Sequence, residues 1–76
     1  NPVNFIYGNI THTSQYTQDL IALLDLYQQH YPVPVPEIQA FAENIDLEFL
    51  LDDLPKLLSS MKVGADRIKK IVVSLR

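Results

Sequence analysis

The sequence predicts an all-α protein: an antiparallel helical hairpin with an extended proline-rich connector and a short extra helix, dimerising into a four-helix bundle. Two long segments of the 76-residue chain carry apolar side chains at helical spacing, and a proline-rich stretch separates them. At about 1.5 Å per residue, these segments form rods of roughly 42 and 45 Å. Their apolar stripes are too wide for contact with one neighbouring helix, which predicts a twofold dimer.

The first long helix is expected at about residues 2–29. Its seam repeats in steps of three and four, the heptad pattern of helices that pack lengthwise. The seam consists of Val3, Ile6, Ile10, Thr13, Thr17, Leu20, Leu24 and Tyr27. Gly8 costs about 1 kcal/mol relative to alanine inside a helix, which favours close approach of a neighbouring helix there.

The connector is expected at about residues 30–46. Pro32, Pro34 and Pro36 forbid regular helix up to Pro36 and favour an extended, polyproline-like path. Pro36 suits the first position of a short helix over about 36–43. Ile38 and Phe41 are candidates to pack over the open end of the bundle.

The second long helix is expected at about residues 47–76, with Asp46 as its N-cap. Its apolar seam repeats in strict alternating steps of four and three. The seam consists of Leu47, Leu51, Leu54, Leu58, Met61, Ala65, Ile68, Val72 and Leu75. The pattern continues in phase through Pro55, which predicts a helix bend rather than a chain reversal.

The core of the predicted dimer is drawn from both seams. It consists of Ile6, Ile10, Leu20, Leu24, Leu54, Leu58, Met61, Ile68 and Val72.

Composition excludes several functions. The chain has no cysteine, so disulfides, cysteine-type zinc sites and thiol catalysis are excluded. The net charge is -3 and every Lys and Arg lies from Lys56 onward, which argues against nucleic-acid binding. No apolar stretch is long enough to insert into a membrane, and a cytoplasmic location is expected. His12 and His30 lie too far apart, without carboxylates at ligand spacing, to predict a metal site.

Two terminal motifs carry a family resemblance. The opening "NPVNFI" resembles the tail of the phosphoacceptor motif of bacterial two-component sensor histidine kinases, whose pattern is His-Glu-x-x-Asn-Pro before an apolar helix. The closing "RIKKIVVSLR" resembles the end of the second helix of the same dimerisation and histidine-phosphotransfer domain. The stretches "LYQQHYP" and "LDDLPKLLSSMKVGADRI" are similar to a subgroup with an extended connector.

The resemblance implies a signal-transduction scaffold in a phosphorelay. The phosphorylated histidine lies five residues before the motif's proline, so it is expected upstream of Asn1, and the chain is expected to be inactive alone. Asn1 matches the position associated with dephosphorylating the partner regulator, and Pro2 the helix-bending proline. His12 and His30 are expected to be surface or helix-end residues.

Partners and cofactors follow from the same resemblance. The expected partners are a second copy of the chain and the receiver domain of a response regulator. Candidates for the regulator-docking surface are Phe5, Tyr7, Arg67 and Lys70. The chain itself has no phosphate-cradling glycine loop, so it needs no cofactor, while the full-length kinase is expected to use ATP and Mg.

One alternative stays open, a non-enzymatic helical oligomerisation or adaptor module with a coincidental Asn-Pro. Whether the parent protein is membrane-anchored, and whether phosphotransfer is within or between subunits, is also open. A histidine followed by an acid upstream of Asn1 distinguishes the kinase from the adaptor.

Overall fold

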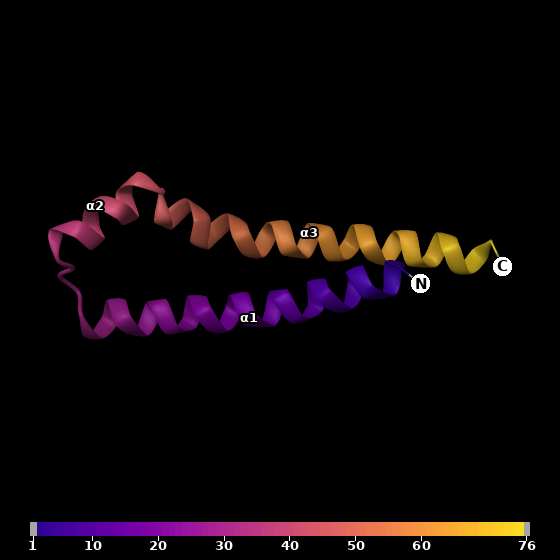
Figure 1. Ribbon diagram of the computed structural model, residues 1–76, viewed down its shortest axis with the longest axis horizontal. Helices are drawn as coiled ribbons and strands as arrows, with labels where there is room; N and C mark the ends of the chain where they lie inside the picture. Colours follow the sequence, from indigo (N-terminus) through magenta and orange to yellow (C-terminus); the bar gives the residue numbers. More distant parts are fainter. Residues whose placement is uncertain (1, 76) are drawn as a thin grey trace.

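Three helices make up the computed structural model, in which residues 2–75 are described (Figure 1). They are α1 (Pro2–His30), α2 (Pro36–Asn44) and α3 (Leu47–Ser74). No strand occurs within residues 2–75, so the predicted all-helical class is confirmed. None of these helices has the length and apolar character that crossing a lipid bilayer requires.

The two long helices lie side by side and run in opposite directions, with both chain ends at the same end of the molecule (Figure 1). The molecule is elongated, with principal extents of 57 × 20 × 15 Å. Helix α2 lies at the other end and contacts α3. No Cα atom of α2 comes within 8 Å of one in α1. Helix α2 is therefore packed closer to α3 than to α1.

The connector, residues 31–35, is not helical. Pro32 and Pro34 lack the amide hydrogens that a helix needs and restrict the residues before them. Pro36 then begins α2, where its missing amide hydrogen costs nothing because first-turn amides have no helical acceptor. Ile38 and Phe41, expected to pack over the end of the bundle, are both mostly exposed in the single chain.

Asp46 separates α2 from α3 and occupies the N-cap position of α3, as predicted. Its side chain, however, makes no capping hydrogen bond. Its backbone has φ 52° and ψ 61°, the left-handed conformation that aspartate tolerates better than most residues. The Leu50 amide donates to the Asp46 carbonyl oxygen at 3.1 Å. Asp46 therefore serves the fold through its backbone, as the bend between two helices.

Helix α3 continues through Pro55 without a break. No second helix starts at this proline. The Asp52 carboxylate accepts a hydrogen bond from the Lys56 ammonium, one turn later, at 3.0 Å.

The single chain has a very small core. Among the described residues, only Ile10, Leu58 and Ala65 are buried apolar side chains. Small domains already bury a low fraction of their apolar surface, and this one buries few large side chains at all. Most of its apolar surface is therefore available to another molecule.

Candidate functional site

A line of exposed, mostly apolar side chains repeats every seven residues along both long helices. It consists of Ile6, Thr13, Leu20 and Tyr27 on α1, of Leu54, Met61 and Ile68 on α3, and of Leu75 at the C-cap of α3. Apart from Thr13, its members range from 42% exposed at Leu54 to 80% at Leu75. These eight residues are called the exposed stripe below. Sevenfold spacing is typical of helices that pack lengthwise against a partner.

A different face of each helix is covered within the chain. The buried and half-buried positions of this contact face include Val3, Tyr7, Ile10, Ser14, Thr17, Ile21 and Leu24 on α1, and Leu47, Leu51, Leu58, Lys62, Ala65 and Val72 on α3. The seam predicted from sequence therefore divides into two parts. Ile10, Leu24, Leu58 and Val72 lie on the contact face, whereas the other predicted dimer-core residues are exposed.

The two halves of the exposed stripe lie on the same side of the helix pair. Each residue turns a helix by about 100°, so the stripe is offset from the contact face by roughly a quarter of a turn on α1 and by a smaller angle, about 50°, on α3. Both offsets have the same rotational sense, and the helices run in opposite directions (Figure 1). The two halves of the stripe therefore lie on the same side of the helix pair and form a single apolar face.

Basic side chains surround Tyr7 near the start of α1. The Lys69 ammonium lies 5.2 Å from the centroid of the Tyr7 ring and the Lys62 ammonium 5.8 Å from it. Cations over an aromatic face are attracted by its negative π density, an effect worth about 0.5–1 kcal/mol at exposed sites. Tyr7 is thus held between two lysines of α3.

Two of the four predicted docking residues lie together here. Tyr7 and Lys70 line a small pocket of ≈ 310 Å³ that also includes Lys69. The Lys70 ammonium pairs with the Asp66 carboxylate at 2.9 Å. Phe5 and Arg67 are exposed but do not line this pocket.

Sequence reasoning missed the roles of Lys62 and Lys69. Their signal is present in the chain, because they are seven residues apart and so share a face of α3. Only the pairing of that face with the start of α1 reveals Tyr7 as their common neighbour.

The remaining predicted positions are spread along the chain. Asn1 lies outside the residues that the structure describes, and Pro2 is the first residue of α1. His12 is exposed and stacks on the Tyr16 ring, with centroids 6.2 Å apart. His30 ends α1 and is also exposed.

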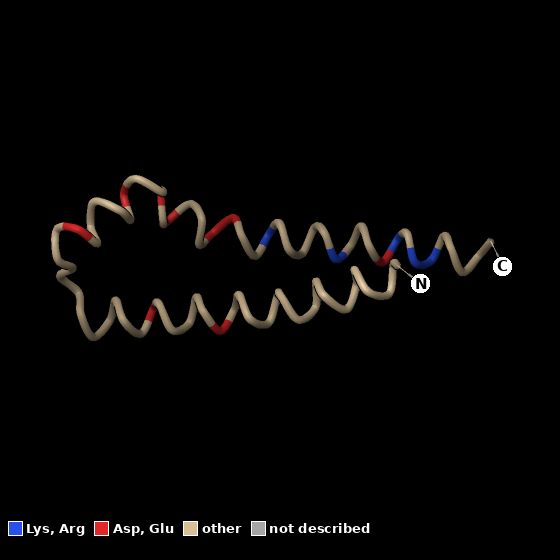
Figure 2. The backbone as a smooth tube through the Cα atoms, viewed as in Figure 1, with Lys and Arg blue, Asp and Glu red and all other residues tan. Residues whose placement is uncertain are grey.

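Charged residues are unevenly distributed. Apart from Asp66, every acidic residue comes before Lys56 in the sequence, and all Lys and Arg residues among residues 2–75 lie on α3 from Lys56 onward (Figure 2). The pKa of Lys56 is raised above its ordinary value because its ammonium donates a hydrogen bond to the Asp52 carboxylate, which also attracts the positive charge. Within residues 2–75, no three side chains of His, Cys, Asp or Glu are grouped so that they could hold a metal ion.

No protein-family model matches the chain, and neither a curated protein nor a solved structure is similar to it. These comparisons therefore assign it to no family.

Proposed function

We propose that the chain is the dimerisation and phosphotransfer scaffold of a two-component sensor histidine kinase. In this proposal it is an antiparallel helical hairpin, and two copies join into a four-helix bundle. The parent kinase transfers the γ-phosphoryl group of ATP, with Mg, to a histidine upstream of Asn1 and then to a response regulator. This chain provides the dimer and the surface on which the regulator docks, in the cytoplasm.

The exposed stripe is the observation that supports dimerisation. Its large side chains lie in water in the single chain, although burying such a side chain contributes about 1.5–3 kcal/mol. A twofold axis through this face places the stripe of one copy against the stripe of the other. Four helices then surround the residues of both stripes, which is the arrangement that wide apolar seams favour.

The position of Tyr7 and its lysines supports regulator docking. They lie near the start of α1, the end of the molecule that adjoins the proposed phosphoacceptor. A cluster of lysines beside a half-buried tyrosine suits an acidic partner, because complementary charges speed association and orient the two surfaces.

The phosphotransfer part is tested on the parent protein. The residues before Asn1 are expected to include a histidine five positions before Pro2, followed by an acid. Incubated with radiolabelled ATP and Mg, the parent is expected to acquire a label that is labile in acid and stable in base, and to lose it when that histidine is replaced by alanine. An acid-stable label, or no histidine at this position, would reject the kinase assignment.

A non-enzymatic oligomerisation or adaptor module is the second candidate, since the exposed stripe supports self-association in either case. If the chain is such a module, the parent protein is expected to acquire no label from ATP, and its dimer is expected to be unaffected by ATP. Oligomer mass alone does not separate the two candidates, but the labelling does.

A further inference from the structure

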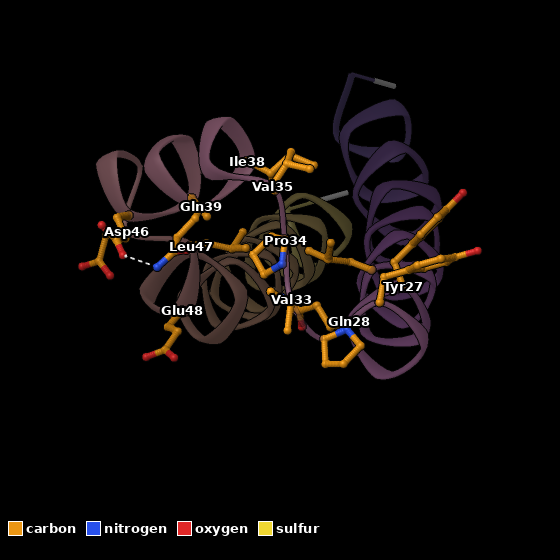
Figure 3. A pocket seen from close by; sticks show the side chains of 15 residues that line it. Tyr27, Gln28, Val33, Pro34, Val35, Ile38, Gln39, Asp46, Leu47 and Glu48 are labelled. Carbon is orange, nitrogen blue, oxygen red and sulfur yellow. Dashed lines mark hydrogen bonds between the residues drawn. The ribbon is translucent and has the colours of Figure 1, made fainter.

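A wide cleft lies at the connector end of the molecule. Its volume is ≈ 1100 Å³, and its walls come from the last turns of α1, the connector, α2 and the first turn of α3. Figure 3 shows Tyr27 on one side, Val33 and Pro34 between, and Leu47 and Ile38 on the other. No Cα atom of α2 lies within 8 Å of one in α1, and the cleft between these helices is open.

Apolar side chains dominate the walls and stay open to solvent. Val33, Val35 and Ile38, none of which belongs to the exposed stripe, are 87%, 58% and 60% exposed. Apolar surface gathered in a concave site, rather than scattered singly, marks a binding surface. The connector prolines cannot rearrange into a helix to cover it.

The charged side chains that line the cleft are all acidic. They are Glu43, Asp46 and Glu48, and no Lys or Arg occurs in the chain before Lys56 (Figure 2). The Gln39 amide donates to the Glu43 carboxylate at 3.3 Å and holds that acid at the wall. The negative charge is therefore not neutralised by any neighbouring cation among the residues that line the cleft.

We infer that the cleft binds a short amphipathic segment of a partner protein, with apolar side chains on one face and Lys or Arg on the other. The apolar face would cover the exposed wall, and the basic side chains would meet the three acids, as charge complementarity requires. A volume above the usual range for small-ligand pockets, together with the open shape, suits a peptide segment.

A second copy of the chain is a poorer occupant. Its connector end carries the same acids, so two such ends would repel. Its own Lys and Arg residues among residues 2–75 lie on α3 from Lys56 onward, and two of them, Lys56 and Lys70, are already paired with Asp52 and Asp66 (Figure 2). The inference does not depend on the kinase assignment.

The experiment uses the 76-residue chain and two fluorescein-labelled helical dodecapeptides. One peptide consists of leucine and lysine with leucine at helical spacing, and the other replaces every lysine with glutamate. Fluorescence anisotropy is expected to show saturable binding of the lysine peptide alone, weakened by added salt. Amide chemical-shift changes are expected at Val33, Ile38 and Leu47.

Matched variants test the charges and the apolar wall. Glu43→Gln combined with Glu48→Gln is expected to lower the affinity about fivefold, since exposed ion pairs contribute modestly. The control is Asp19→Asn combined with Asp25→Asn, which removes the same charge outside the cleft and is expected to change the affinity less than twofold. Ile38→Ala is expected to weaken binding severalfold, whereas Phe41→Ala, also on α2 but not lining the cleft, is not.

Several results would overturn the inference. If the two double variants lost affinity equally, the peptide would be attracted non-specifically to an acidic chain. Shift changes centred on Leu20 and Met61 would place the peptide on the exposed stripe instead. Binding of the glutamate peptide, or of neither peptide, would also reject a basic partner at the cleft.

Discussion

Leu20 allows a direct test of whether the exposed stripe is a contact surface. It lies at the middle of the α1 half of the stripe and is 66% exposed in the single chain. Full burial of a leucine side chain is worth about 1.5–3 kcal/mol, so covering the exposed two-thirds contributes about 1–2 kcal/mol per copy. In a symmetric dimer the Leu20 contribution is lost in both copies. Leu20→Ala should therefore weaken the free energy of dimerisation by about 2–4 kcal/mol, which raises the dissociation constant roughly 30- to 700-fold.

Leu26→Ala is the matched control. Leu26 is also on α1 and 51% exposed, but it lies about 120° around the helix from Leu20, away from both the stripe and the contact face. Sedimentation equilibrium over a range of concentrations measures the dissociation constant of each variant. A monomeric wild-type chain at high concentration, or equal effects of the two substitutions, would refute the assignment of the stripe as the dimer face.

Three further predictions concern stability and titration. Gly8→Ala should raise the free energy of unfolding by about 0.5–1 kcal/mol in thermal denaturation, because a Cβ at Gly8 meets nothing within 4 Å and alanine is the better helix former. Pro55→Ala should stabilise the chain by up to about 3 kcal/mol in urea unfolding, because α3 is continuous there and proline lacks one amide hydrogen. A loss of stability would contradict this expectation. Asp52→Asn should lower the pKa of Lys56, read from its side-chain NMR titration, because the carboxylate hydrogen bond raises it. Because the pKa of Lys56 is raised in the folded chain, its ion pair with Asp52 stabilises the fold below the unfolded pKa, and this stabilisation is lost as the pH rises through the folded pKa. The free energies of unfolding of the wild type and of Asp52→Asn should therefore become equal only in strongly alkaline solution.

The helical class could be predicted from sequence because its causes are local. The seven-residue repeat and the prolines of the connector act through spacing and backbone restriction along a short stretch of chain. Which residues of each long helix face the other long helix could not be predicted in this way. Ile6 and Ile10 belong to the same predicted seam, yet Ile6 is 52% exposed and Ile10 is 7% exposed. Heptad spacing identifies a stripe on a helix but not which part of it meets the other helix of the same chain.

The candidate sites depended on tertiary placement in the same way. The sequence predicts close helix approach at Gly8, but within residues 2–75 no atom of another helix comes within 4 Å of the position of its missing Cβ. Aspartate is a residue type that often caps a helix with its side chain. At the bend between α2 and α3, however, Asp46 has a left-handed backbone and its side chain makes no capping hydrogen bond. The lysines around Tyr7 become neighbours only through the register of α1 against α3.

The seven-residue phase of α3 restricts how the length of this chain can vary. One residue inserted after Leu54 would rotate everything that follows by about 100°, moving Met61, Ile68 and Leu75 off the apolar face together. Only insertions or deletions of about seven residues, two full turns, would restore that face. Residues 31–35 carry no helical phase, so length changes there leave both long helices in register. Among sequence variants with the same fold, differences in length should therefore accumulate in the connector, while the spacing from Leu54 to Leu75 stays constant.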